Sequence, residues 1–476
     1  MDVLSILVGL AVPWALGAGV LLVISGRRLL EPGGVAWTLG CGWFVGSFLL
    51  TVWMRAVSYA GLKFGWLSVA LPLVVLAGVL LMVAWRRDAS VARAMRTSIA
   101  ETWRSFRPRD RSPASERGWT WLGLAILAWL AVRFLLLLLE LCWRPLYPWD
   151  AWAQWADKAR VWFGLRSMAP FVGASEWLNA ATPSVYYDPA PHYPATIPLL
   201  QTWMATLLDR WDDALVNIPW WLTGIAVGLL VYGFLAQRRF SPLLALCGAW
   251  TVLSLPILDA HIALAGYADL AMGGFFAAAA LTTLHWCEER DPSDGLLAAG
   301  LCIACATIKT PGIVWVATLL PALAVALIPK RGLTVVAALA AVLAFTVALL
   351  AHDGIRVLGY ALQLSFAFPW RGLLNAYFAF DNWHLLWYGA CAVVLLARRQ
   401  LLAPALAAFT VLIGAGIAFL LFSFTFTSAS AWVEDQTTVN RATLHLAPLL
   451  VIWMFLAYRE WTRAGEVPVG TETVPA

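Results

Sequence analysis

The chain consists largely of apolar runs of about 20 residues, the length that an α-helix needs to cross a bilayer, separated by short polar segments. The pattern predicts an all-α, polytopic membrane helix bundle. The thirteen predicted spans lie near residues 3–24, 35–54, 65–85, 119–141, 216–236, 241–258, 267–286, 295–309, 311–328, 332–350, 384–397, 401–422 and 442–458. The first run, MDVLSILVGL, has no basic region before it, so we interpret it as a span rather than a cleaved signal peptide.

The basic residues between the runs predict the orientation of the bundle. They gather in six segments that all fall on one side: Arg27/Arg28, residues 86–117, Arg238/Arg239, Lys330/Arg331, Arg398/Arg399 and Arg459/Arg463. By the positive-inside rule that side is cytoplasmic. We therefore expect the N-terminus outside, the C-terminus inside, and outer loops at 142–215, 352–383 and 423–441.

The same pattern divides the chain into parts. The expected parts are three leading spans (1–85), a basic cytoplasmic linker (86–118), a transmembrane core with outer loop 142–215 (119–458) and a cytoplasmic tail (459–476). Residues 195–208 are apolar enough for a further span, but that crossing would reverse every later basic loop. We therefore expect a re-entrant or surface-lying helix there.

Composition supports a membrane protein and excludes several other classes. The chain is 62% hydrophobic and 12% charged, whereas soluble domains carry about 25% charged residues. Its 29 tryptophans fit interfacial belts. The net charge of +5 does not indicate nucleic-acid binding, because most arginines lie in short loops. The seven cysteines form no disulfide framework or zinc spacing, and no P-loop or dinucleotide fingerprint is present. Any chemistry must therefore use groups at the membrane.

Residues 147–163, YPWDAWAQWADKARVWF, form the most informative stretch. Read as a helix at about 100° per residue, it places Asp150, Gln154 and Asp157 on one face. The other face is apolar and comprises Trp152, Trp155, Ala156, Ala159, Trp162 and Phe163. Such a helix is expected to lie in the headgroup plane with its tryptophans toward the lipid. It is either a reaction site or an aromatic anchor with solvated charges.

Two acids stand out as candidates for chemistry. Asp150 follows the fourth span after Pro148 and Trp149, where a partly shielded carboxylate can accept a proton from a hydroxyl. Asp157 could orient a substrate, although solvation is the favoured reading. Asp269 opens the small-residue run GYADLAMGGFF, which permits close helix packing, and helix capping is its alternative role.

Two cations lie on the predicted outer side, against the positive-inside trend. Lys309 precedes a break at Pro311, and Arg441 enters the last span. Each could bind a phosphate or extend toward the headgroups. His192 could be a ligand, a proton donor or a turn residue. Arg133 and Glu140 in the fourth span are expected to be too far apart to pair, with Glu140 extending to the outer surface.

These motifs, in this order, resemble the GT-C superfamily of integral-membrane glycosyltransferases, of the aminoarabinose and mannosyl transferase type. The resemblance covers roughly residues 119–458. LYPWDAWAQWADKARVWF is similar to the segment that carries the family's catalytic acid, which implicates Asp150. GYADLAMGG resembles the family's second acidic motif and implicates Asp269, and ATIKTPG resembles its Thr-Lys motif and implicates Lys309. NRATLHLAP resembles its arginine motif and implicates Arg441. HYPATIPLLQTWMATLL is similar to a His/Pro-rich segment of the family and implicates the region of His192.

The resemblance implies a polyprenyl-phosphate sugar donor, a glycan, lipid or protein hydroxyl acceptor, contact with membrane lipid, and a site facing the periplasm from a bacterial cytoplasmic membrane. Catalysis is assigned to Asp150 and Asp269, and substrate binding to Lys309, Arg441, His192, Asp157 and Gln154. No acidic pair directly follows the fourth span, so a divalent metal, Mg or Mn held by Asp150 and Asp269, stays an open question. A transporter or flippase of a lipid-linked sugar is the alternative function, and a non-catalytic scaffold is a third.

Overall fold

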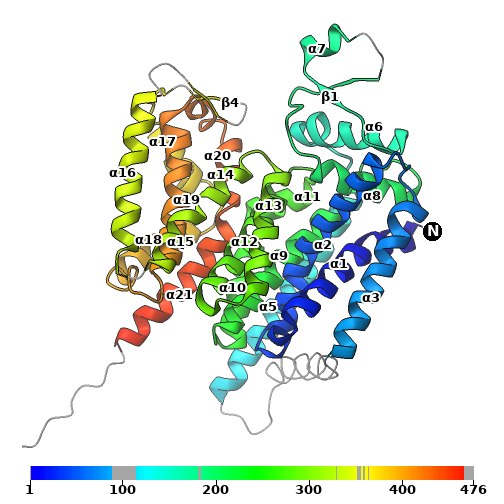
Figure 1. Ribbon diagram of the computed structural model, residues 1–476. Helices are drawn as coiled ribbons and strands as arrows, with labels where there is room; N and C mark the ends of the chain where they lie inside the picture. The colour runs from blue at the N-terminus through cyan, green and yellow to red at the C-terminus, as the bar shows by residue number, and fades with distance from the viewer. Residues whose placement is uncertain are drawn as a thin grey trace, which may run out of the picture. The chain divides into compact units, whose positions relative to one another are not determined.

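The computed structural model describes residues 2–87, 114–180, 184–328, 330–350, 355–357, 360–362 and 364–465. These residues are mostly helical, as the apolar runs predict (Figure 1). The chain divides into two compact units, Met1–Ala317 with Arg441–Pro448, and Thr318–Asn440 with Leu449–Ala476. Most of the predicted linker 86–118, part of the loop 352–383 and the end of the predicted tail lie outside the described residues.

The first unit contains nearly all of the elements up to residue 317. They are α1 (Asp2–Ser25), η1 (Gly26–Leu30), α2 (Gly34–Tyr59), η2 (Trp66–Ala70), α3 (Leu71–Arg87), α5 (Ala114–Trp143), η3 (Ala151–Ala156), α6 (Asp157–Leu165), β1 (Phe171–Val172), α7 (Ala174–Leu178), β2 (Tyr186–Tyr187), α8 (Thr196–Leu208), η4 (Leu215–Asn217), α9 (Ile218–Gln237), α10 (Pro242–Leu253), α11 (Pro256–Ala263), α12 (Asp269–Glu289), α13 (Pro292–Ile308) and α14 (Gly312–Ala317). β1 and β2 pair in parallel.

The second unit contains the later elements. They are α15 (Leu319–Leu327), α16 (Gly332–Leu350), β3 (Ile355–Val357), β4 (Tyr360–Leu362), α17 (Trp370–Leu374), η5 (Asn375–Ala379), α18 (Leu386–Leu396), α19 (Ala407–Phe426) and η6 (Ser428–Trp432). β3 and β4 pair antiparallel. The division between the units falls within α20 (Thr437–Leu444) and within α21 (Ala447–Gly465).

Among the described residues, seven helices are long and apolar enough to cross a membrane, and nine if each of two bent helix pairs counts as one span. The bent pairs are α10 with α11, at 62°, and α20 with α21, at 57°. Shorter apolar helices occupy Pro292–Ile308, Gly312–Leu327, Gly332–Val347 and Leu386–Leu396. These helices indicate a multi-pass membrane protein, while the predicted count of thirteen spans stays a prediction.

The leading helices of the first unit pack closely because glycines face their neighbours. A Cβ on Gly46 of α2 would lie 1.6 Å from the Pro13 carbonyl oxygen of α1, so only glycine fits there. On the side of α2 that faces α9, a Cβ on Gly40 would lie 2.6 Å from the Leu230 nitrogen. Small residues let helix backbones approach in this way in membrane bundles. The leading helices therefore pack directly onto α9 (Figure 1).

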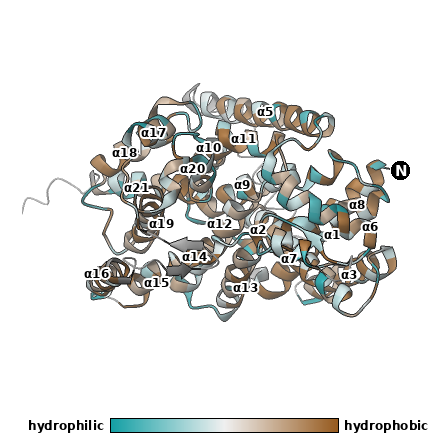
Figure 2. Ribbon diagram, turned by 90° about the horizontal axis from the view of Figure 1, so that it is seen from above, coloured by the Kyte–Doolittle hydropathy of each residue, from teal (hydrophilic) through white to brown (hydrophobic). Residues whose placement is uncertain are grey.

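Helix α12 is the most enclosed candidate span of the first unit. Every residue from Asp269 to His285 is buried, and α12 contacts α2, α9, α13 and α14, which surround its label in Figure 2. A helix that is apolar on all sides is expected in such a position. The one acid among these buried residues, Asp269, stands at the helix N-terminus and is the starting point of the candidate site.

The helical segment 151–165 differs from its predicted setting. Trp155 and Trp162 are only 1% and 4% exposed. Trp155 packs beside Tyr193, and Trp162 beside Phe171 and close to α8. Of the tryptophans on the predicted lipid-facing side, Trp152 is 45% exposed. The apolar face therefore contacts protein for most of its length, because an apolar stripe fits a protein core as well as it fits lipid.

Helix α8, predicted as a re-entrant or surface-lying helix, is completely buried. All thirteen of its residues are buried, and it packs against α1, α2 and α6. At about 1.5 Å per residue it is also too short to cross a hydrocarbon core of about 30 Å. α8 is therefore a core element of the first unit covered by protein, and its re-entrant or surface-lying placement relative to the membrane stays a prediction.

Candidate functional site

Asp269 is the centre of a buried ionic network in the first unit. Its carboxylate is 1% exposed. The Lys309 Nζ atom donates to Asp269 Oδ1 at 2.7 Å, and Arg441 Nε donates to Oδ2 at 2.9 Å. His445 Nε2 lies 3.0 Å from Oδ1. Both oxygens of one acid are thus engaged by side chains from distant parts of the sequence.

The partners of Asp269 lie at or near the ends of helices. Lys309 follows the end of α13 in an extended conformation, two residues before Pro311, which cannot continue a helix. Arg441 lies in α20, and His445 follows four residues later. Gly273 of α12 lets this segment approach, because a Cβ there would lie 3.0 Å from the Leu444 carbonyl oxygen.

Arg441 links Asp269 to a second carboxylate. Its Nη2 atom lies 2.6 Å from Asp150 Oδ2, and the Asp150 side chain is 27% exposed. Charge-assisted contacts of this length are among the strong hydrogen bonds in proteins. Asp150 therefore has the most exposed side chain of the network while it is held in an ion pair.

Tyr267 completes the surroundings of Arg441. The guanidinium carbon lies 4.0 Å from the centre of the Tyr267 ring, a cation–π contact. The backbone here passes close to residue 151, because Gly266 has φ +106° and its Cβ would lie 2.7 Å from Ala151 Cβ. This close approach brings the start of η3 next to the α11–α12 connection.

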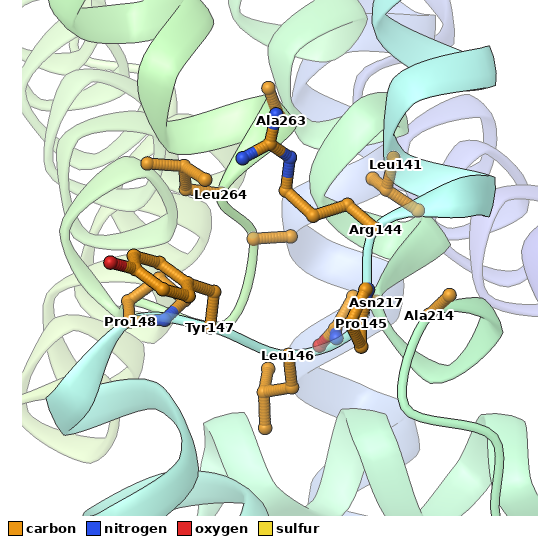
Figure 3. Close-up of a pocket in the computed structure, with 11 residues that line it drawn as sticks. Leu141, Arg144, Pro145, Leu146, Tyr147, Pro148, Ala214, Asn217, Ala263 and Leu264 are labelled. Atoms are coloured by element: carbon orange, nitrogen blue, oxygen red, sulfur yellow. The ribbon is translucent and has the colours of Figure 1, made fainter.

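A small pocket borders the same two segments. Its lining includes residues 144–148, which lead to Asp150, and 263–265, which lead to Tyr267, with Leu141, Ala214 and Asn217 (Figure 3). Its cavity volume is about 10 Å³, which is room for roughly one water molecule and far below the roughly 300–1,000 Å³ of typical ligand pockets. The pocket is therefore a water-sized space beside the network.

The structure brings together Asp150, Asp269, Lys309 and Arg441 but places the other predicted site residues differently. Gln154 is half-buried in η3. His192 is exposed and its ring lies beside that of Tyr193, tilted by 37° with ring centres 5.1 Å apart. Partial burial and the nearby Asp188 carboxylate raise the pKa of Asp157 above its usual range. Asp157 is nevertheless exposed, as the favoured interpretation of a solvated carboxylate expects.

Sequence reasoning missed several charged partners. Lys158 is buried with Nζ 3.1 Å from Asp188 Oδ2, and burial lowers its pKa although Asp188 opposes this. Arg133, which was expected to lie too far from Glu140 to pair with it, donates from Nε to Asp259 Oδ2 at 2.8 Å. Glu140 pairs with Arg144, one helical turn away, at 2.7 Å.

His445 was also missed as a site residue. Its position four residues after Arg441 was the available signal, since side chains at that spacing share a helix face.

The predicted metal pair, Asp150 and Asp269, shares Arg441. Among the residues that the structure describes, no group of three or more His, Cys, Asp or Glu side chains could hold a metal ion. Asp269 has both oxygens engaged by nitrogen atoms. In this arrangement its carboxylate balances protein cations rather than presenting a free ligand.

Comparisons with protein-family models, curated proteins and solved structures find no match to this chain. Its class is therefore defined by its own features, a multi-pass helical membrane protein with a buried acid–cation network at the N-terminus of its most enclosed candidate span.

Proposed function

We propose that the protein is an inverting glycosyltransferase that moves a sugar from a polyprenyl-phosphate donor to a hydroxyl acceptor at the outer face of the membrane. The observation that supports this proposal is the network itself. Asp150, Asp269, Lys309 and Arg441 come from four separate segments, yet they form one chain of ion pairs. These are the residues that the resemblance to the GT-C superfamily implicates.

In the proposed reaction, Asp150 is the catalytic base. The acceptor oxygen forms a bond to the anomeric carbon as the bond from that carbon to the phosphate oxygen breaks. The acceptor proton passes to the Asp150 carboxylate, and the polyprenyl phosphate leaves with the bonding electron pair. Arg441 holds the Asp150 carboxylate in a fixed orientation.

The cations of the network are suited to the leaving phosphate. A guanidinium offers five N–H donors and an ammonium three, so the contacts with Asp269 and Asp150 leave donors for a ligand. Preorganised donors of this kind stabilise charge that develops in a transition state. Asp269, buried and engaged on both oxygens, is a positioning residue in this proposal, because it holds Lys309 and Arg441 in place.

The topology belongs to the same proposal. It has thirteen spans, an external N-terminus, a cytoplasmic C-terminus, and a bacterial cytoplasmic membrane as its location. The six basic segments on one side of the predicted bundle support this orientation. Asp150 and Lys309 then lie on the outer side, where a lipid-linked donor and an acceptor can meet.

The test is sugar transfer by the full chain in lipid nanodiscs. Radiolabelled polyprenyl-phosphate sugars serve as donors, and envelope extract serves as the acceptor pool. Asp150→Asn is expected to lower transfer by about 10²- to 10⁴-fold, the usual contribution of a general base. Asp209→Asn is the matched control, because it makes the same change at an exposed carboxylate outside the network, and it should retain transfer.

Full transfer by Asp150→Asn would remove Asp150 as the base. Movement of labelled lipid across reconstituted vesicles without sugar transfer would instead favour the transporter alternative.

A further inference from the structure

Arg55 of α2 is a half-buried cation held by hydroxyl groups. Its Nη2 atom donates to Thr196 Oγ1 at 2.8 Å, and its Nη1 atom to Thr51 Oγ1 at 3.3 Å. Thr196, the first residue of α8, donates in turn to Thr307 Oγ1 of α13 at 3.0 Å. Two hydroxyls therefore contact the guanidinium directly, and the third, Thr307, is linked to it through Thr196.

The charge of Arg55 is not balanced as the other enclosed cations are. Arg28, Lys158, Lys309 and Arg441 of the first unit each contact a carboxylate. Within the described part of the chain, Arg55 forms no ion pair and has hydroxyl partners instead. A partly desolvated cation without a counter-ion is unfavourable, so this group is electrostatically suited to receive an anion.

The position of the cluster indicates which anion. Thr307 precedes Lys309 by two residues, a backbone separation of at most about 7 Å, so the hydroxyl cluster adjoins the cations of the Asp269 network. One turn before Arg55, on the same side of α2, Val52 is 41% exposed. An apolar surface beside a cation on a candidate membrane span fits a phosphate that carries a lipid tail.

We propose that Arg55, Thr51, Thr196 and Thr307 form an anion-binding subsite for the phosphate of a lipid. The guanidinium can hold two phosphate oxygens in its planar fork, and the hydroxyls orient a third. The lipid tail lies along Val52. The subsite deepens the proposed function and rests on it for the class of ligand, a lipid phosphate donor. It also assigns the leading helices a part in binding.

The test is binding to the full chain in phosphatidylcholine nanodiscs, with farnesyl phosphate as the probe and farnesol and inorganic phosphate as separate arms. Arg55→Met is expected to weaken farnesyl phosphate binding by about tenfold to a hundredfold, the loss of one or two charge-assisted hydrogen bonds. Farnesol binding should not change. Arg160→Met, which removes an equal charge from an exposed position on α6, should bind farnesyl phosphate as the unaltered protein does.

Arg55→Lys keeps the positive charge but loses the planar guanidinium group. This variant keeps the test possible if Arg55→Met does not fold. It should lose about threefold to tenfold in farnesyl phosphate affinity without any change for farnesol. Equal binding of farnesyl phosphate by unaltered protein and by whichever Arg55 variant folds would overturn the subsite. If inorganic phosphate binds as tightly as farnesyl phosphate, the lipid assignment is wrong.

The two proposals fail in different ways. Arg55-dependent binding of farnesyl phosphate without sugar transfer would support the subsite and count against the transferase. If the protein transfers sugar but its affinity for farnesyl phosphate does not depend on Arg55, the subsite is wrong and the transferase proposal stands.

Discussion

Two buried ionic networks lie at opposite ends of α12, and their charges are arranged in opposite ways. At the N-terminus an acid, Asp269, is surrounded by Lys309, Arg441 and His445. Toward the C-terminus a cation is at the centre. Arg28, 3% exposed, contacts Asp294 through Nε at 3.1 Å, with Glu289 at 3.2 Å and Glu31 at 3.7 Å.

This difference indicates which of the two networks can accept an anionic ligand. Arg28 joins the α1–α2 connection to the end of α12 and the start of α13, and three carboxylates already surround its charge. An anion has no reason to approach it. The Asp269 network carries its cations on the outside of a buried acid, and Arg441 reaches the partly exposed Asp150. It is therefore suited to an anionic substrate.

The largest effects are expected from removing the central carboxylate of each network. Asp269→Asn leaves Lys309 and Arg441 without their shared counter-ion and should lower the free energy of unfolding by about 3–5 kcal/mol. Asp294→Asn should cost about 1–3 kcal/mol, because Arg28 keeps Glu289 and Glu31. Tryptophan fluorescence during denaturant unfolding in detergent measures both variants.

Sugar transfer per folded molecule separates the two networks further. It should be lost in Asp269→Asn and kept in Asp294→Asn. Equal loss in both variants would contradict the division between a functional and a structural network.

Replacing Arg441 or Arg28 with lysine should have an intermediate effect and tests whether only the Asp269 network serves sugar transfer. Lysine lacks the planar fork that lets Arg441 contact Asp269 and Asp150 together, so Arg441→Lys should lower kcat by about 10²- to 10³-fold, as for the loss of an oxyanion donor. Arg28→Lys is the matched change and should alter stability alone. Transfer assays at saturating donor, paired with unfolding curves, distinguish the two results.

The smallest effect is expected at Tyr267. Tyr267→Leu removes the ring face beneath Arg441 and should cost about 0.5–1 kcal/mol, with a loss of transfer below about tenfold. Tyr267→Phe keeps that face and should behave like the unaltered protein. A large loss in Tyr267→Phe would show that the hydroxyl, rather than the ring, serves the site.

Part of the candidate site was predictable because charged residues at the ends of apolar runs are conspicuous. Asp150, Asp269, Lys309 and Arg441 stand at such ends, and charge within or beside a span is costly enough to need a reason. Their pairing was not predictable. A carboxylate and a cation 172 positions apart, Asp269 and Arg441, meet only when helices from different parts of the chain pack together.

The same limit explains the errors. An apolar helix face looks identical in sequence whether lipid or protein covers it, so the tryptophans of the segment 151–165 were expected at a surface. Arg133 and Lys158 were judged by neighbours along one helix, whereas their partners, Asp259 and Asp188, come from other segments. Arg55 carried no local signal, because its hydroxyl partners belong partly to α8 and α13.

Apolar run length and helical periodicity are local properties, and they were enough to predict a helical membrane protein and the residues at the ends of its spans. The tertiary structure decided which of those ends meet, which apolar faces are enclosed by protein, and which cations have a counter-ion. Those outcomes depend on packing between distant segments, where glycines such as Gly46 and Gly266 permit the close approaches that no single helix specifies.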